Sequence, residues 1–509
     1  MIKSWKQLSE YNREVDCSDT LKHRQEKWLF ECIGRNKGTD YGRKYNFGQI
    51  KTIIDYQKQV PIVSYQDIST YIESIAKGGS NCLFAEEAIA FERTSGSTCN
   101  QKLIPYSQES IIDFRRAILP WLSALTEQYK IISGNAYWAI SPATRQPELT
   151  ESGIQIGLPD VEYLGEDLMP FFLDNSTVPS WVAEISDVKV WQLVTLYYLV
   201  CCNNLSLISV WSPTFLLTLL NALYERRNEL EKLLLRGLEV QGYKLQANQS
   251  AYANLQNYYI RKEWNVLWPE LKVISCWADA SSKFYSERLN SYFQGVPIQP
   301  KGLLLTEGVV TAPNRDNQTV LTADSGFYEF IDEGQNIKLA HELCIGDKYE
   351  VIMTTSGGLY RYRTCDRVVC DGYATDLPIL RFLGRELSSD MVGEKLTEEF
   401  VTSCLEGAGG FSMLIPFADK IPGYLLIVDD ELNVNSVIDK VETRLHENPQ
   451  YAYACKLGQL RPIRAIQLKD PLEVYLNSSA HAGARLGDIK VPSLCLKTEI
   501  FNEYMGDAV

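Results

Sequence analysis

The hydrophobic pattern of the chain changes character twice along its length, and this constrains the fold more than any other feature. Up to about residue 320, helical patterns alternate with short β-like runs such as 136–140 and 272–275, which is typical of α/β layers. Between 320 and 382 the segments are aromatic and β-branched, and a tail of alternating helices and strands follows. We predict an α/β fold: a large N-terminal α/β domain with a small β-barrel-like subdomain, plus a small α+β C-terminal domain.

Several elements can be placed more closely. Residues 1 to about 80 show helical spacing that Pro61 interrupts, and a later helix has Ser212 as its cap, Pro213 in its first turn and Gly237 at its end. Two β-branched runs around Ser356-Gly357-Gly358 predict a hairpin, with strands 349–355 and 359–364. The tail predicts a helix at about 394–406, a strand at Gly423–Val428, a helix at Val434–Leu445 and a strand near Ala465–Leu468.

Length and charge narrow the class of protein. A chain of 509 residues exceeds what one hydrophobic core usually supports, so two or three domains are expected. The net charge of −14 argues against nucleic acid as the main partner, because phosphate neutralisation requires clustered Lys and Arg. The most apolar region, Val188 to Leu223, is broken by Gln192, Asn203 and Pro213, so no membrane-spanning helix is expected.

The thirteen cysteines indicate a reducing compartment. Their number is odd, they form no CxxC pair, and the N-terminus lacks the apolar core of a signal peptide. The four histidines lie far apart in sequence and near no cysteine pair, which gives little support to a zinc site. We therefore expect a cytoplasmic enzyme.

A hydroxyl-rich segment, Phe91 to Pro105, is the first candidate for chemistry. Hydroxyls and backbone N–H groups in such a turn hold phosphate oxygens, and a following lysine adds positive charge. It lacks the GxxxxGK[ST] pattern of a Walker A loop, and a plain surface loop would have the same composition. The candidate residues are Thr94, Ser95, Gly96, Ser97, Thr98 and Lys102.

Two carboxylates follow apolar runs. Thr306 and Glu307 end the run from Leu303, where they suit a phosphate and Mg²⁺, a cation that prefers oxygen ligands. Asp366 closes a predicted strand, where it would accept hydrogen bonds from ribose hydroxyls. The alternatives are a solvated strand end for Glu307, and ordinary strand surface charges for Arg361, Arg363 and Asp366.

Two later segments complete the series. Gly384-Arg385 joins two compositionally distinct regions and suits a hinge. Lys490 stands between Gly487 and Pro492. A plain linker and a solvated surface lysine are the alternative readings.

The order of these segments resembles the acyl-adenylate-forming (ANL) superfamily. Within it the chain is most similar to the auxin-responsive (Gretchen Hagen) acyl acid amido synthetases, especially their bacterial members. Tyr349–Asp366 and Phe382–Leu396 carry the resemblance most specifically, and a weaker similarity extends from about residue 20 to 495.

The resemblance implies an ATP-dependent amide ligase with the fold of the adenylate-forming enzymes. A carboxylic acid would attack the α-phosphorus of ATP, and an amine or amino acid would then take the acyl group from AMP. The expected cofactors are ATP and Mg²⁺, with no nucleic acid, membrane or obligatory protein partner. Residues 1–384 would bind nucleotide and acid, and 385–509 would form the mobile domain.

Residue roles follow from the same resemblance. Lys490, Glu307 and Lys102 would be catalytic, with Glu307 the metal ligand and Lys490 a mobile lysine that reaches the α-phosphate. Thr94, Ser95, Gly96, Ser97 and Thr98 would bind phosphates, Thr306 the α-phosphate, and Asp366 and Arg385 the ribose. Trp121, Trp138, Arg145 and Tyr163 are the candidates for the acid pocket, with Arg145 as a carboxylate partner; each is also suited to a structural role.

The sequence departs from the family pattern at several positions. Cys99, Asn100 and Gln101 replace Gly-Lys-Pro in the phosphate loop. Leu303 stands for a tyrosine that packs on adenine, Leu305 for a serine, Cys365 for a glycine and Ser493 for an arginine. Two alternatives therefore stay open: transfer to coenzyme A, a carrier protein or an alcohol, and a non-catalytic protein that binds acyl groups or nucleotide.

Overall fold

The computed structural model describes residues 4–10, 19–94, 102–139, 148–158, 163, 165, 168–385, 388–418, 421–482 and 484–501. Its N-terminal part is helical, as predicted. Thr39 and Thr52 cap α3 and α4 by accepting backbone N–H groups of the first turn, and Pro61 lies between α4 and α5. The helices are α1 (Trp5–Glu10), α2 (Leu21–Asn36), α3 (Asp40–Lys44), α4 (Ile53–Gln59) and α5 (Tyr65–Ala76).

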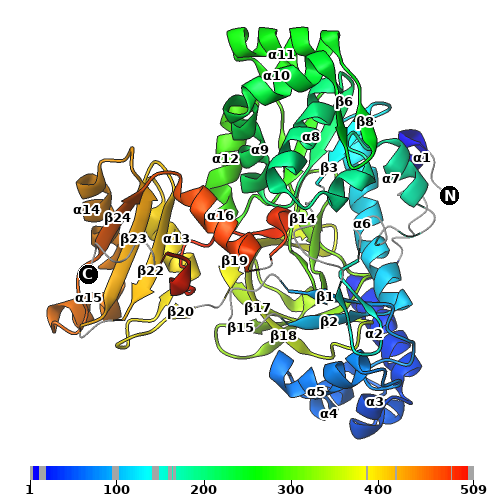
Figure 1. The fold of residues 1–509 in the computed structure, drawn as a ribbon. Coiled ribbons are helices and arrows are strands. Elements are labelled where there is room, and N and C mark those ends of the chain that lie inside the picture. Colours follow the sequence, from blue (N-terminus) through cyan, green and yellow to red (C-terminus); the bar gives the residue numbers. More distant parts are fainter. Residues whose placement is uncertain are drawn as a thin grey trace.

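The large domain contains a four-stranded parallel sheet, whose strands β3 and β6 are labelled near α8 in Figure 1. Its order is β10-β9-β6-β3, and every neighbouring pair is parallel, so the carboxyl ends of the strands meet at one edge. The predicted runs at 136–140 and 272–275 correspond to β3 and β9. The strands are β3 (Asn135–Trp138), β6 (Leu205–Ser209), β9 (Val273–Cys276) and β10 (Ile298–Pro300).

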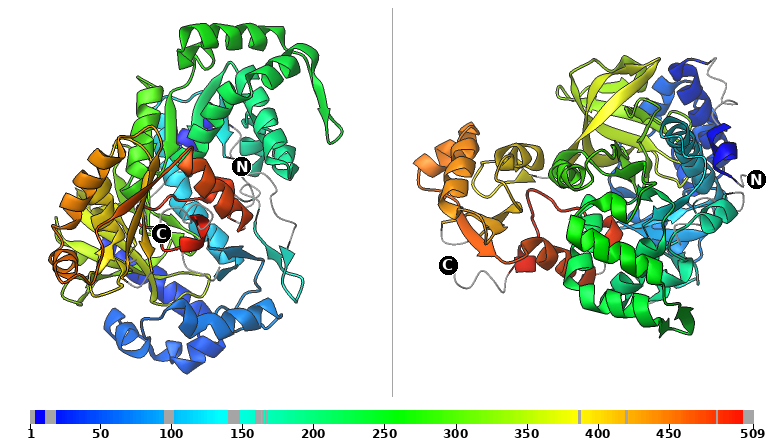
Figure 2. Two further views of the ribbon diagram at one scale, coloured as in Figure 1. Left: turned by 60° about the vertical axis from the view of Figure 1, so that its left-hand side comes forward. Right: turned by 90° about the horizontal axis from the view of Figure 1, so that it is seen from above.

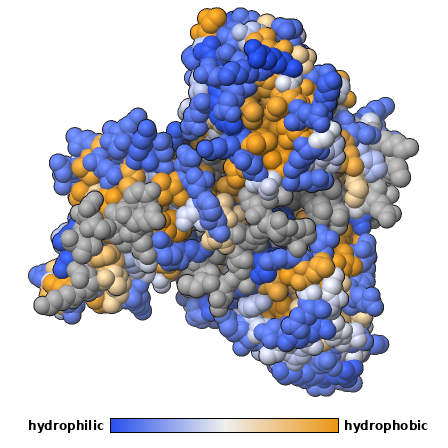
Figure 3. Space-filling model, in the orientation of Figure 1, coloured by the Kyte–Doolittle hydropathy of each residue, from blue (hydrophilic) through white to orange (hydrophobic). Residues whose placement is uncertain are grey.

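Helices between these strands contribute Trp191 and Phe215 to the largest core cluster, which also takes in strand residues such as Ile208 and residues of the C-terminal unit such as Met413. On the face drawn in Figure 3, apolar residues gather over α8 and α9. Among the described residues, no helix is long and apolar enough to cross a membrane. The helices are α6 (Gln108–Gln128), α7 (Met169–Asp174), α8 (Val188–Cys201), α9 (Pro213–Glu225), α10 (Arg227–Arg236), α11 (Gln249–Arg261) and α12 (Lys283–Tyr292).

The single helix predicted between Ser212 and Gly237 is wrong in two respects. The helix breaks at Arg226, whose guanidinium bonds Glu229 in the first turn of α10 at 2.7 Å and so stabilises the start of a second helix. Ser212 does not cap the first helix with its side chain, because its hydroxyl pairs with Thr214 at 2.6 Å. Gly237 ends α10 at φ 74°, as expected of a helix-terminating glycine.

A second four-stranded sheet has the order β2-β1-β5-β4. Its antiparallel pair β1 and β2 brackets residues 95–101 of the hydroxyl-rich segment. Two short hairpins, β7–β8 and β11–β12, extend the domain. The bounds are β1 (Ala90–Arg93), β2 (Leu103–Tyr106), β4 (Glu148–Leu149), β5 (Gln155–Ile156), β7 (Leu238–Val240), β8 (Tyr243–Leu245), β11 (Leu304–Leu305) and β12 (Gly308–Val309).

The β-rich subdomain is a seven-stranded antiparallel sheet in the order β13-β14-β19-β18-β17-β15-β16. The predicted hairpin is present as β17 and β18, which pair from Met353 opposite Tyr362. The strands are β13 (Thr311–Pro313), β14 (Thr319–Leu321), β15 (Phe327–Asp332), β16 (Ile337–Leu339), β17 (Lys348–Thr354), β18 (Tyr362–Ala374) and β19 (Leu377–Arg385).

Two expectations for this sheet need correction. Asp366 does not close a strand but lies inside β18, which continues to Ala374. The strand is this long because all of β19, from Leu377 to Arg385, pairs with it. Arg361 is not a surface charge: it is 3% exposed and forms a two-bonded ion pair with Glu329 at 2.8 and 3.0 Å. Its guanidinium also donates to the carbonyl of Val60, which ties the N-terminal helices to the sheet.

The C-terminal residues form an α+β unit, coloured from yellow through orange to red in Figure 1. Its sheet has the order β22-β23-β24, with α13 to α15 against one face and α16 against the other. The elements are β20 (Ser388–Ser389), β21 (Leu396–Thr397), α13 (Glu398–Leu405), β22 (Ser412–Phe417), β23 (Gly423–Asp429), α14 (Val434–Leu445), α15 (Pro449–Lys456), β24 (Arg464–Leu468) and α16 (Pro471–His481).

After α16 the chain returns to the large domain. Helix α16 lies between the C-terminal sheet and the large domain (Figure 2), and the Gly487 carbonyl then accepts the backbone N–H of Ser212 at 3.3 Å. Ser212 stands shortly after β6, so residues 486–491 run past the carboxyl edge of the parallel sheet. This path carries Lys490 to that edge.

Candidate active site

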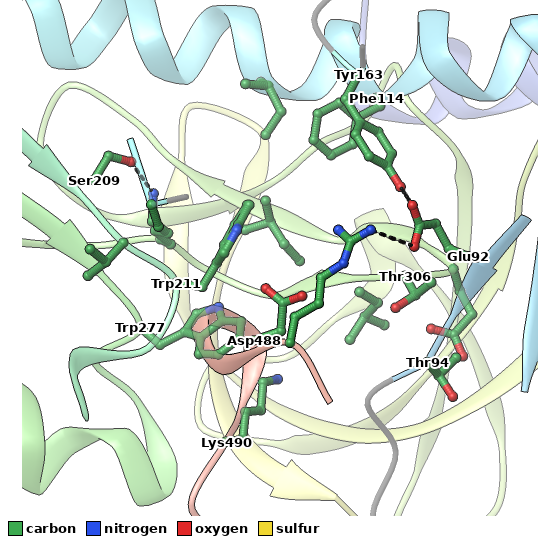
Figure 4. A pocket seen from close by; sticks show the side chains of 18 of the residues that line it. Glu92, Thr94, Phe114, Tyr163, Ser209, Trp211, Trp277, Thr306, Asp488 and Lys490 are labelled. Carbon is green, nitrogen blue, oxygen red and sulfur yellow. Dashed lines mark hydrogen bonds and ion pairs between the residues drawn. The ribbon is translucent and has the colours of Figure 1, made fainter. Parts of the chain in front are cut away.

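A cavity of about 250 Å³ opens where the parallel strands end. In open α/β sheets ligands bind at the carboxyl ends of the strands, and each strand here contributes a lining residue at its end. Trp138 ends β3, Ser209 ends β6, Trp277 follows β9 and Lys301 follows β10. Trp211, two residues after β6, lines the cavity as well (Figure 4).

The cavity brings together most of the described residues that the sequence singled out. Its wall includes Thr94, Trp121, Trp138, Tyr163, Thr306, Glu307, Arg385 and Lys490. Asp366 and Lys102 lie behind this wall and bond lining residues or their neighbours, as described below. Ser95, Gly96, Ser97, Thr98 and Arg145 lie outside the described residues, as do Cys99, Asn100 and Gln101.

Thr94 and Lys102 stand at the base of the loop that joins β1 and β2. The backbone N–H of Thr94 donates to the Lys102 carbonyl at 3.0 Å, which closes the loop at its base. The Lys102 ammonium donates to the Tyr362 hydroxyl at 3.2 Å, and that hydroxyl donates to Glu307 at 3.4 Å. Lys102 and Glu307, the candidate metal ligand, are therefore linked through the Tyr362 hydroxyl.

Thr306 and Glu307 form the turn between β11 and β12, so both side chains stand at the cavity. Leu303, in contrast, is 3% exposed and packs in the core with Val310 and Tyr328. The resemblance implies a tyrosine at this position, but the Leu303 side chain does not line the cavity, whereas Leu305 does.

Asp366 and Arg385 are cross-strand partners on β18 and β19. The Arg385 Nε donates to Asp366 Oδ1 at 3.1 Å, and this carboxylate is the main reason that the pKa of Arg385 is raised. Asp366 is completely buried, and among the described residues its Oδ2 has no hydrogen-bond partner. A buried carboxylate oxygen in this state favours a ligand that donates a hydrogen bond.

Cys365 stands in a backbone conformation that favours glycine, the residue that the resemblance implies at this position. Its φ is +62°, in the left-handed region, at a point where the register of β17 and β18 shifts. Cys365→Gly is expected to raise the free energy of unfolding by about 0.5–1 kcal/mol, because glycine adopts this conformation without steric cost. Urea unfolding would measure this change in the free energy of unfolding. Cys344→Gly is the control and should lose stability, because Cys344 does not have a positive φ. A loss in Cys365→Gly would contradict the strain argument.

Lys490 enters the cavity from the C-terminal unit. Its ammonium lies 4.6 Å from the centre of the Trp277 ring and 5.5 Å from that of Phe382. Burial, and next the charge of Arg385, lower the pKa of Lys490. Lys490 is half-buried and lines the cavity, which contradicts its alternative interpretation as a solvated surface residue.

Glu398 is a residue that sequence reasoning missed. It begins α13, is 8% exposed, and accepts the backbone N–H of Ser493 at 3.4 Å. Burial raises its pKa to about 7, while the positive charges of Arg385 and Lys490 act in the opposite direction. The carboxyl thus lies close to both cations and supports the segment that carries Lys490.

Glu92 connects the C-terminal segment with the opposite wall. One of its oxygens accepts from the Tyr163 hydroxyl at 2.7 Å and from the Leu158 backbone at 2.5 Å, and the other lies 3.9 Å from the Arg485 guanidinium. Tyr163 was expected in the acid pocket and lines the cavity, whereas no sequence signal pointed to Glu92 or Arg485.

Lys301, like Arg485, is a cation at the cavity that sequence reasoning did not identify. It is 2% exposed and donates to Ser209 at 2.7 Å, with the ring centres of Trp121 and Trp211 at 4.5 and 4.9 Å. Burial lowers the pKa of Lys301 to about 7. Its position directly after a buried strand was the one signal that could have identified it.

Three potential metal ligands lie close together in the C-terminal unit. Glu442, His446 and Cys455 bring potential ligand atoms within 4.8 Å of one another on α14 and α15, so one histidine is close to a cysteine in space although not in sequence. The Glu442 carboxylate already accepts the backbone N–H of Ile463 at 2.8 Å. The described cysteines form no disulfide.

Comparison with known proteins identifies the family. The GH3 family N-terminal domain matches residues 13–298, and the GH3 family central domain matches residues 319–385. The chain belongs to the GH3 family. The GH3 chain is a ligase of the acyl acid amido synthetase type, which confirms the family-level expectation from the sequence.

Individual relatives are distant in sequence and close in fold. The GH3 chain is 24% identical over 430 residues to the indole-3-acetic acid-amido synthetase GH3.15 of Arabidopsis thaliana, covering 74% of this chain and 70% of that protein. The structure of AtGH3.15 acyl acid amido synthetase in complex with 2,4-DB superimposes with a TM-score of 0.84 at 18% identity, covering 95% of this chain and 93% of that one.

A 2-hydroxyisobutyryl-CoA ligase in the postadenylation state superimposes with a TM-score of 0.56 at 12% identity, over 98% of both chains. The predicted adenylate-forming α/β fold, with a β-rich subdomain and a C-terminal domain, is therefore confirmed.

Proposed function

We propose that the GH3 chain uses this one cavity to activate a carboxylic acid with ATP and then to join the acyl group to an amino acid. The chain catalyses ATP-dependent acid adenylation and amide formation as a member of its family. The observation that carries the residue assignments is the convergence of Glu307, Arg385 and Lys490, from three distant parts of the chain, on a single cavity.

The first step forms the acyl-adenylate. A carboxylate oxygen of the acid attacks the α-phosphorus of ATP, the bond to the bridging oxygen breaks, and pyrophosphate leaves. The pentavalent transition state gains negative charge, and Lys490 and Thr306 stand at the cavity to offset it by charge and hydrogen bonding. In the second step the amine nitrogen of the acceptor attacks the acyl carbon, the bond to the phosphate oxygen breaks, and AMP leaves.

Mg²⁺ fits the carboxylate of Glu307. This side chain stands at a turn beside the cavity and accepts one hydrogen bond among the described residues, from Tyr362 at 3.4 Å. A single carboxylate together with substrate phosphates is the usual ligand set for this cation in proteins. When bound, Mg²⁺ would neutralise phosphate charge and favour the departure of pyrophosphate.

The nucleotide assignment rests on Asp366, whose Oδ2 is buried and lacks a partner among the described residues. Asp366→Asn is expected to raise the KM for ATP by about 10- to 100-fold, because a charged acceptor of ribose hydroxyls is lost. Steady-state exchange at varied ATP would measure this. Asp371→Asn is the matched control, since Asp371 pairs with Arg381 on the same two strands but at the surface. An unchanged KM in Asp366→Asn would remove the ribose assignment.

The decisive experiment is acid-dependent exchange between ATP and pyrophosphate over a broad panel of acids. Exchange identifies the activated acid, and its absence with every acid would overturn adenylation in favour of a non-catalytic binding protein. Acceptors are then screened with amino acids, other amines and coenzyme A. A thioester product would replace the proposed amide by the alternative reading.

Three narrower assignments stay predictions from the sequence. Residues 385–509 are proposed as a mobile domain that rotates between the two half-reactions. The bacterial branch of the family and a cytoplasmic location are the others. Limited proteolysis with and without an adenylate analogue would test the rotation, which predicts protection of the 384–388 junction in one state only.

A further inference from the structure

Lys301 is a buried cation that the reaction proposed above does not use. It directly follows β10, and its ammonium meets one hydroxyl, Ser209, and two indole faces, Trp121 and Trp211. Removing an ammonium from water is costly unless charge or hydrogen bonds compensate. Indole faces supply a part of this compensation, and one hydroxyl supplies one acceptor.

The protein provides no anion for this cation. Among the described residues Lys301 forms no ion pair, and Ser209 is its single hydrogen-bond acceptor. An ammonium has three N–H donors, so two lack a described protein acceptor. Because Lys301 lines the cavity, a ligand there can supply the negative charge and the hydrogen-bond acceptors that the described protein residues do not.

The titratable group nearest in effect to Lys301, the Cys276 thiol, does not supply a negative charge. Cys276 is the group whose charge would act on Lys301, and burial raises the pKa of that thiol to about 12, so it stays neutral. Burial lowers the pKa of Lys301 to about 7, and an anion bound beside the ammonium would oppose this effect and stabilise the charged form.

The position of Lys301 separates it from the reacting end of the cavity. Ser209 lies at one side of the site, while Thr94 and Thr306 lie at the other with Trp211 between them (Figure 4). Lys490, assigned to the α-phosphate, stands against Trp277. A bound acid whose carboxylate reaches Lys490 and Thr306 would therefore direct its far end, across the indole rings, toward Lys301.

We propose that Lys301 and Ser209 form a subsite for a second oxygen anion or acceptor at the end of the acid remote from the reacting carboxylate. The substrate class is a flat acid with a distal carboxylate or phenolic oxygen, held between indole faces. This inference rests on the proposed function and specifies its acid.

Matched acid pairs test the subsite. Benzoate and terephthalate, cinnamate and 4-carboxycinnamate, and phenylacetate and 4-hydroxyphenylacetate differ by one distal group. In the wild type, kcat/KM for exchange is expected to favour the distally substituted member of at least one pair by about 10- to 100-fold, the effect of a charge-assisted hydrogen bond. The carboxylate pairs and the phenolic pair show which oxygen the subsite takes. No preference in any pair would overturn the proposal.

Lys301→Met removes the charge and keeps the length of the side chain. We expect it to abolish the distal preference and to raise exchange with the unsubstituted acids, because a dry apolar end replaces a buried cation. Lys272→Met is the matched control, since Lys272 bonds the Lys130 carbonyl at the amino end of the neighbouring strand β9. An equal loss for both members of each pair in Lys301→Met would overturn the subsite.

A second variant and a second readout guard the test. Ser209→Ala keeps the cation and is expected to reduce the distal preference by about fivefold, the effect of one hydrogen bond, so it decides the matter if Lys301→Met does not fold. Quenching of tryptophan fluorescence by the same acid pairs reports binding without turnover, since Trp121 and Trp211 flank Lys301. If no acid supports exchange, the proposed function fails, and the fluorescence titration still decides the subsite.

Discussion

Glu307→Ala is expected to lower acid-dependent ATP–pyrophosphate exchange by about a thousandfold, since the variant loses the oxygen ligand for Mg²⁺. Glu307 stands at the β11–β12 turn, and its charge raises the pKa of the neighbouring Arg385. The loss should appear in kcat more than in the KM for the acid, because the charge matters most when pyrophosphate departs. Exchange at saturating acid, with magnesium varied, measures both effects.

Two variants isolate the role of the charge. Glu307→Gln keeps the shape of the side chain and should be nearly as inactive as alanine. Glu270→Ala removes an exposed glutamate and should exchange at the wild-type rate with an unchanged melting temperature. Near-normal exchange in Glu307→Ala would refute the metal assignment, because no other residue has been placed as its carboxylate ligand.

Lys490→Ala is expected to lower the rate of adenylation by about 10²- to 10³-fold, the usual cost of losing one positioned charge at a transition state. Transfer from a chemically prepared acyl-adenylate should fall much less, since the charge on the α-phosphate changes less in that step. The ratio of the two rates is the measurement. An unaffected adenylation rate would remove Lys490 from the mechanism.

The lowered pKa of Lys490 predicts that the rate of adenylation depends on pH. Burial and Arg385 lower the pKa of Lys490, while Asp366, Glu398 and Glu307 oppose them by raising it. The charged form is the active one, so adenylation falls as the pH rises through this lowered pKa, earlier than for an ordinary lysine. Lys490→Arg stays charged and should move this alkaline limb to higher pH. A profile that is identical in both proteins would show that another group controls the limb.

The order of the chemical segments along the chain was sufficient to predict the family, and it singled out several residues that the structure brings to one cavity. Thr306, Glu307, Asp366 and Arg385 belong to local patterns of apolar run, carboxylate and glycine, and such patterns remain visible without the fold. Their predicted surroundings were less accurate. Asp366 lies inside a strand rather than at its end, because pairing with β19 extends β18 well beyond the hairpin.

The part of the cavity around Lys301 could not be predicted in the same way. Ser209, Trp277 and Lys301 come from three strands that are far apart in sequence, and only the parallel order of the sheet brings their ends together. Each residue alone follows a short apolar run, which many buried strands would also provide. The contact between Glu92 and Arg485 depends on how the C-terminal segment returns, which no local pattern encodes.

The C-terminal segment supplies Arg485, Asp488 and Lys490 to the wall of the cavity. The cavity is therefore complete only while this C-terminal segment lies against the large domain. The proposed rotation of residues 385–509 would let acid and nucleotide enter before this wall is in place, and would hold both until the wall withdraws. Kinetically, this order of events favours the acyl-adenylate reaching its acceptor over losing its acyl group to bulk water.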